Sequence, residues 1–407
     1  MNKRSQLPLI LATAFLDMLG LGIFIPVLPD IIANFGIAAS WSGYTQGIYA
    51  LGMFMGWLVF WGLSDRYGRK KMLVITSSLN LLWYMMMLFA VWQAPIISVQ
   101  ATTLWWGFGF FSIVFLISRW IGGLGWAGFW VVQAYISDIS SKDSRTKNMG
   151  LMGAMFGLWF LIGPALGALL SNFAGIAGSI VACTVIIFLN VVSIIFFLQE
   201  PKKHIEKSTS DVFEKFSFSR DVIILFILTF WATVAFSSIQ SMSGQYYKDV
   251  FAFTPREIGF TMAIVGWVAV AYQWYFVRFV RKICDEIQMI HIAFFMLTVS
   301  FFWFALNTSV MGIYFWVIFF PLGMWSFHPS VGSLLGARAG REVGKVMGYN
   351  TSVASIGQIA WPVIMGTIYA FQDITFFGYT FSHYTFPFLF GFLIFIGLFA
   401  LSFRLHR

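Results

Sequence analysis

The stretch LSDRYGRKK, residues 63–71, lies between two long apolar segments, 41–62 and 73–93. Each segment is long enough to cross a bilayer, since a transmembrane helix takes about 20 apolar residues. Between the two segments, Gly68 permits a tight turn, and the charged side chains around it require water. The stretch therefore predicts two transmembrane helices joined by a short charged loop.

The composition extends this interpretation to the whole chain. Of the 407 residues, 59% are hydrophobic and 10% are charged, whereas a soluble domain carries roughly 25% charged residues. A water-soluble core cannot bury so much apolar surface, because single cores stop growing near roughly 250–300 residues. The net charge of +9 does not indicate a nucleic-acid-binding protein, because the basic residues lie in the loops between apolar segments. Cys183 and Cys284 form no metal-binding or redox motif.

Twelve apolar segments are long enough to span a membrane, six on each side of the polar stretch 199–220. We expect an all-α integral membrane protein with an N-terminal half (1–198), a cytoplasmic linker (199–220) and a C-terminal half (221–407). Segment 94–110 either extends the flanking helices or lies along the membrane interface. The expected spans are roughly 8–28, 41–62, 73–93, 108–136, 149–171, 175–198, 221–244, 255–277, 289–308, 311–335, 346–371 and 384–403.

The basic residues predict the side of the membrane on which each loop lies. If both termini are cytoplasmic, 22 of the 25 Lys and Arg residues lie on the cytoplasmic side, as the positive-inside rule requires. Lys248 and Arg256 then lie outside, and Arg119 lies within a span. We therefore expect a monomeric, multi-pass protein of the cell's inner (cytoplasmic) membrane, surrounded by lipid.

Loop 63–71 resembles the signature loop between the second and third helices of the major facilitator superfamily, although Trp61 replaces the usual glycine. The resemblance implies a fold of two pseudo-symmetric halves with six helices each. In that family the loop stabilises the outward-facing state and does not bind substrate. The resemblance therefore implies that conformational switching depends on Asp65, Arg66, Gly68, Arg69 and Asp138.

Segment 16–29, with Asp17 and several Gly and Pro residues, resembles the first helix of the twelve-helix drug:proton antiporters, which include the tetracycline exporters. Asp17 lies about ten residues from either end of its span, which places it roughly 15 Å deep. A charge at that depth costs at least about 2.5–3.5 kcal/mol. Asp17 is therefore either a carboxyl that takes up and releases a proton or an inert carboxyl hydrogen-bonded to a neighbouring helix.

Two further resemblances concern the fourth and fifth spans. Arg119 resembles an arginine implicated in proton coupling. Because arginine stays protonated, it either favours the ionised form of Asp17 or holds an anionic substrate group. We prefer Asp17 as the partner, since the resemblance implies neutral or cationic substrates. The fifth span partly matches the antiporter motif of exporters, although helix packing accounts for the same residues equally well: Gly150, Gly163, Pro164 and Gly167.

Together these features predict a secondary transporter, and they include no enzyme, cofactor or metal motif. We expect alternating access that moves a small organic solute, with proton-coupled efflux of a drug or metabolite as the preferred function. The alternatives are a siderophore or metabolite carrier, including one for uptake, and a non-transporting receptor or scaffold. His328 is either a neutral hydrogen-bonded histidine or a proton carrier. The candidate substrate contacts are Trp41, Tyr49, Gln240, Tyr272, Gln273, His328, Asn350 and Gln358.

Overall fold

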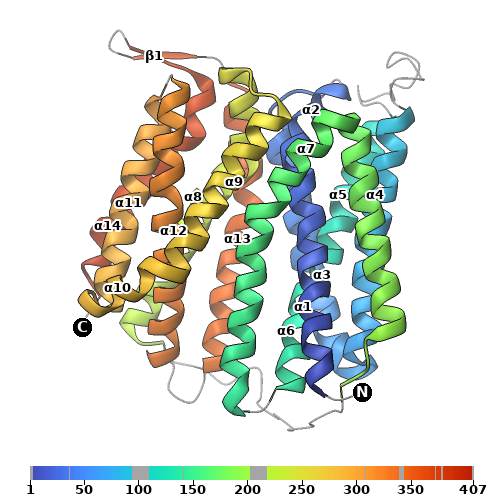
Figure 1. Cartoon of the computed structure of the whole chain (residues 1–407). Coiled ribbons are helices and arrows are strands. Elements are labelled where there is room, and N and C mark those ends of the chain that lie inside the picture. Colours follow the sequence, from blue (N-terminus) through green and yellow to red (C-terminus); the bar gives the residue numbers. More distant parts are fainter. Residues whose placement is uncertain are drawn as a thin grey trace.

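The structure is a computed structural model that describes residues 3–35, 37–93, 110–140, 142–201, 218–307, 309–338, 343–371, 373–376 and 379–405. Within these ranges the chain forms a bundle of long helices that run between the same two ends of the molecule (Figure 1). Both termini lie towards one end, and we call the opposite end, where α2 lies, the distal end. Most of the predicted segments 94–110 and 199–220 lies outside the described residues.

The elements before the predicted linker are helical. They are α1 (Lys3–Phe24), η1 (Ile25–Val27), α2 (Leu28–Asn34), α3 (Trp41–Tyr67), α4 (Arg69–Gln93), α5 (Phe110–Trp126), α6 (Gly128–Ile139) and α7 (Lys142–Phe197). After the linker, the helices are α8 (Arg220–Phe251), α9 (Pro255–Ala271), the π-helical η3 (Tyr272–Phe276), α10 (Val277–Ile283), α11 (Glu286–Leu306), α12 (Val310–Arg338), α13 (Val343–Tyr369), η4 (His383–Thr385) and α14 (Phe386–Ser402).

Nine helices in the described part of the chain are long and apolar enough to cross a membrane. One of them contains Gly175, whose φ of 66° and ψ of −172° break α7 into two helices. Figure 1 shows α7 turning at the distal end and returning alongside α4. The twelve expected spans follow if α7 counts as two helices and if α3 and α9 also cross, and this count stays a prediction.

The buried hydrophobic residues form separate clusters on the two sides of the predicted linker. The largest contains residues between 222 and 405, and the other two contain residues between 10 and 198. Each set of helices therefore packs around its own core. This packing supports the predicted halves 1–198 and 221–407, although their boundary stays a prediction.

A short antiparallel hairpin departs from the expected all-α architecture. Strands β1 (Ile374–Phe376) and β2 (Tyr379–Phe381) pair at the distal end (Figure 1). Each strand has three residues, which is too short for a period-2 pattern of apolar residues to reveal it in the sequence.

The two halves meet at the distal end. There α3 packs against α13, α8 packs against α2, and α7 packs against α9. The hydroxyl groups of Tyr44 and Thr367 are hydrogen-bonded at 2.8 Å, and Lys248 forms an ion pair with Asp30. Both contacts join residues of opposite halves, so they close the distal side of the interface between the halves.

Candidate functional site

A cavity of about 320 Å³ lies between the two halves. Its lining comes from α1, α3, α5, α6 and α7 on one side and from α8, α12 and α13 on the other. The side chains are apolar, aromatic or uncharged polar, and none of the described lining residues is Asp, Glu, Lys or Arg. Its volume lies within the range of small-molecule pockets, about 300–1,000 Å³. We call it the central cavity.

Five of the eight candidate substrate contacts line the central cavity: Tyr49, Gln240, His328, Asn350 and Gln358. The structure does not bring the other three to it. Trp41 lies at the distal start of α3, where its ring contacts Tyr44 at 4.9 Å. Tyr272 is buried within the C-terminal half and hydrogen-bonded to Ser326 at 2.5 Å, and Gln273 follows it in η3.

Sequence reasoning also missed several residues of this cavity. Trp126 and Phe129, which stack at 6.0 Å, lie between the central cavity and a small pocket around Asp17, and they line both. Gln46 also lines the central cavity. Aromatic residues are so frequent in these helices, at 20% of the chain, that composition could not separate cavity-facing rings from lipid-facing rings.

Asp17 lies inside the N-terminal half, against α4. The Ser77 hydroxyl donates a hydrogen bond to Asp17 Oδ2 at 3.1 Å, while Oδ1 is buried and has no hydrogen-bond partner among the described residues. The side chains of Asn80 and Asn190 are also close to this carboxyl group. The pocket beside Asp17 measures about 10 Å³, which is close to the space that one water molecule needs.

Arg119 is 2% exposed and lies among aromatic rings of three other helices. Its guanidinium carbon is 4.4 Å from the ring centre of Tyr49, 5.3 Å from that of Phe24 and 5.4 Å from that of Trp83. The ion pair with Asp17 that the sequence suggested is absent from the described residues. The two residues line different cavities, Asp17 the small pocket between helices of the N-terminal half and Arg119 a cavity lined by both halves.

Loop 63–71 forms the predicted turn. Gly68 has a φ of 100°, a value that favours glycine. Arg69 donates hydrogen bonds to Asp138 Oδ2 at 2.9 Å and to Ser64 Oγ at 2.5 Å, and it forms an ion pair with Asp65 at 2.6 Å. Sequence reasoning missed Glu200, whose carboxylate accepts hydrogen bonds from the first backbone N–H groups of α4 at 2.6 and 3.0 Å.

Asp65 is the more exposed member of its ion pair with Arg69. Its side chain is 54% exposed, its ion pair with Arg69 lies within one half, and it forms no ion pair with a described residue of the other half. In this structure the halves are joined at the distal end, far from Asp65. Arg66, the neighbouring charged residue, lies in the last turn of α3.

The small residues of the antiporter-like motif mediate close helix contacts. A Cβ atom on Gly163 would lie 2.7 Å from the Cα of Gly22, and one on Gly167 would lie 2.3 Å from the carbonyl oxygen of Ile23. The carbonyl oxygen of Pro164 lies 2.4 Å from where a Cβ on Gly259 of the other half would be. These residues therefore let α7 pack tightly on α1 and on α9, and Gly150 lies near the other end of α7.

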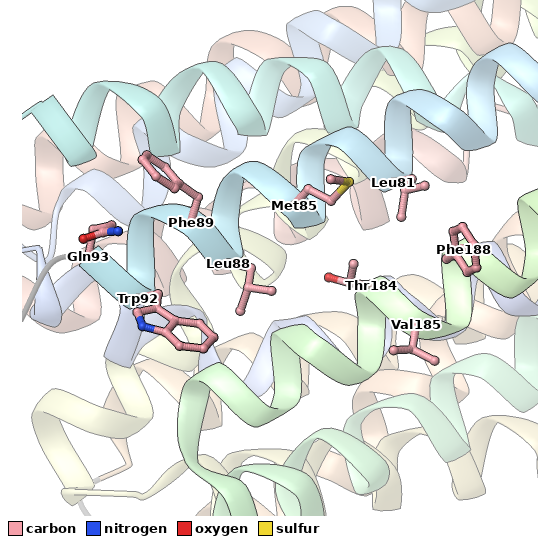
Figure 2. Close-up of a pocket in the computed structure, with 9 residues that line it drawn as sticks. All are labelled: Leu81, Met85, Leu88, Phe89, Trp92, Gln93, Thr184, Val185 and Phe188. Carbon is pink, nitrogen blue, oxygen red and sulfur yellow. The ribbon is translucent and has the colours of Figure 1, made fainter.

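A hollow on the outside of the bundle is a different feature. It measures about 640 Å³ and runs between α4 and the second part of α7, away from the interface between the halves. Figure 2 shows its lining, which is apolar apart from Gln93 and Thr184. Residues such as Phe89 and Phe188 are about half-exposed there, at 49% and 53%. The hollow faces the surroundings of the bundle, so we do not regard it as the transport site.

A membrane-spanning bundle with two separately packed halves, a cavity between them and ionisable side chains inside the bundle near that cavity is the architecture of a secondary transporter. In such a transporter, the halves rock about a central site so that it opens alternately to each side.

The sequence profile of the Major Facilitator Superfamily matches residues 10–362, so this chain belongs to that family. It is 26% identical over 402 residues to multidrug resistance protein 2 of Bacillus subtilis, covering 96% of this chain and 92% of that protein. It is also 26% identical over 404 residues to the quinolone resistance protein NorA of Staphylococcus aureus, covering 91% and 90%.

Solved structures show the same fold at lower identity. The nucleoside transporter NupG aligns with a TM-score of 0.73 at 12% identity, with 100% of both chains covered. The human organic anion transporter MFSD10 aligns with a TM-score of 0.69 at 17% identity, with 99% of this chain and 100% of that chain covered. The predicted family, fold class and transporter function are therefore confirmed.

We expect Asp65→Asn to slow transport several-fold and to leave ligand affinity within a few-fold of wild type. Asp65 is not among the residues that line the central cavity, and we expect its loop to change partners only when the halves move. Initial rates of transport in proteoliposomes and equilibrium binding in detergent measure the two effects. Asp373→Asn, which removes a half-exposed carboxylate at the distal end, is the control. A large loss of affinity with an unchanged transport rate would contradict the prediction.

Proposed function

We propose that this protein exports small, largely apolar organic compounds in exchange for protons, and that Asp17 carries the coupling proton. The main observation in support of this proposal is the central cavity, which is lined by aromatic and uncharged polar side chains from both halves. Aromatic faces bind apolar compounds and delocalised cations, and neutral amides orient them without imposing a charge. The relatives named for multidrug and quinolone resistance support the same function.

The proposal includes a topology and a mode of movement. Both termini are cytoplasmic in the inner membrane, and the protein acts as a monomer. The halves 1–198 and 221–407 move against each other about the central cavity, and linker 199–220 connects them. The contacts between the halves at the distal end then correspond to a state that is closed on the outer side.

Transport into inverted vesicles tests the function. Reconstituted protein should move a fluorescent, aromatic, lipophilic compound into the vesicles when their lumen is made acidic, and transport should saturate with substrate concentration. Movement of the compound out of the inverted vesicles, which corresponds to uptake into a cell, would indicate a metabolite or siderophore carrier. Absence of flux from correctly folded protein would indicate a receptor or scaffold.

Gln240 and Gln273 provide a matched pair for locating the site. Gln240 lines the central cavity, whereas Gln273 lies in η3 outside it. We expect Gln240→Leu to change the half-saturating substrate concentration roughly tenfold, which corresponds to about 1.4 kcal/mol, because it removes a hydrogen-bonding group that faces the substrate. Gln273→Leu should change it less than twofold. Equal effects of the two variants would place the substrate outside the central cavity.

A further inference from the structure

A second cavity, of about 40 Å³, lies beside the central cavity on its distal side. Arg119 lines it together with polar residues of both halves, which are Ser42, Gln46, Gln240, Ser241 and Gln245. We propose that this Arg119 cavity binds a small monovalent anionic group, either a free inorganic anion such as chloride or the carboxylate of a transported compound. The inference does not depend on the proposed function, because anion binding is measurable without transport.

The charge of Arg119 has no anionic partner among the described residues. Its Nη2 donates a hydrogen bond to Gln46 Oε1 at 3.1 Å, but Nε and Nη1 are buried and donate to none of the described residues. No described carboxylate forms an ion pair with it. A buried, unpaired charge costs several kcal/mol. The faces of Phe24, Tyr49 and Trp83 offset only part of this cost, since each cation–π contact contributes about 0.5–2 kcal/mol.

The lining supplies further hydrogen-bond donors, and none of its described residues carries a negative charge. Because the carbonyl oxygen of Gln46 accepts from Arg119, the amide NH₂ of Gln46 remains available to donate to an anion. The exposed amide of Gln240 makes no hydrogen bond to the described residues and lines both cavities. None of the described residues that line the Arg119 cavity is Asp or Glu. An anion there would have donors from both halves.

The size of the cavity restricts the ligand. About 40 Å³ holds an ion or the end group of a larger molecule, but not a drug-sized compound. A carboxylate could occupy it while the rest of the compound lies in the central cavity, because Leu21, Gln46, Tyr49 and Gln240 line both. Since both halves contribute to the cavity, a bound anion should favour the arrangement that is closed at the distal end.

Thermal unfolding of the purified full chain in detergent tests the proposal. Chloride is titrated against methanesulfonate at constant ionic strength, and benzoate is compared with benzamide in a second series. A ligand that binds only the folded state raises the unfolding temperature in a saturable way. Saturable stabilisation by chloride identifies a free inorganic anion, and stabilisation by benzoate but not by benzamide identifies a carboxylate. Either outcome supports anion binding in the Arg119 cavity only if the stabilisation is lost when Arg119 is replaced.

Arg119→Gln should remove the stabilisation, and Gln46→Leu should raise the half-saturating anion concentration roughly tenfold. Gln46→Leu also serves as the test if Arg119→Gln does not fold. Arg256→Gln, which removes an exposed arginine charge elsewhere, should respond as wild type does. The proposal is overturned if neither anion stabilises the wild-type protein in a saturable way. It is also overturned if the folded Arg119 or Gln46 variants respond as wild type does.

Discussion

Asp17→Asn should abolish transport driven by a pH gradient, with a loss of at least about 100-fold, and leave substrate binding intact. Asn has nearly the same shape as Asp and can still accept the hydrogen bond from Ser77, so the surrounding helices should pack unchanged. It cannot take up and release a proton, however, and the carboxyl is deep in the bilayer, where a charge is costly. The substitution therefore removes the titratable proton site and preserves the packing around it.

Two transport assays in proteoliposomes distinguish proton coupling from movement of the substrate itself. Transport driven by an imposed pH gradient should disappear in Asp17→Asn, whereas exchange of labelled for unlabelled substrate without a gradient should continue. Asp17→Glu, which retains a titratable group, should keep measurable coupling. Undiminished pH-driven transport by a correctly inserted Asn variant would show that Asp17 is a structural, hydrogen-bonded carboxyl.

The helices and the buried charges could be predicted from the sequence because apolar segments bounded by basic loops have few alternative structures. Asp17 and Arg119 could be singled out from the sequence because each is an ionisable residue inside an apolar segment. The break at Gly175 also falls between two predicted spans, 149–171 and 175–198.

The direction of each side chain could not be predicted in the same way. Helices that are apolar on all sides carry little 3.6-residue periodicity, so Trp41 and Tyr272 were as plausible in the cavity as Trp126. The π-helical turn at 272–276 further shifts the residues that follow it around the helix. The surroundings of Arg119 come from three other helices, and only the tertiary structure brings them together.

The distal contact between α3 and α13 allows a test of alternating access itself. The two helices touch through their backbones. A Cβ atom on Gly43 would lie 2.1 Å from the carbonyl oxygen of Pro362 and 2.7 Å from the Cα of Gly366. Real Cβ atoms essentially never approach other atoms below 3.0 Å, so a side chain at Gly43 fits only if the helices separate.

Gly43→Val should therefore hold the distal end open and reduce transport to background. Folding should be preserved, because the contact joins the halves and is not part of either hydrophobic core. Spin labels on the exposed residues Asn34 and Arg256, on opposite halves at the distal end, should report a longer distance than in wild type. Gly348→Val is the matched control in α13, since a Cβ on Gly348 meets nothing within 4 Å. Normal transport by a folded Gly43→Val protein would mean that α3 and α13 need not touch during the cycle, and that the halves close elsewhere.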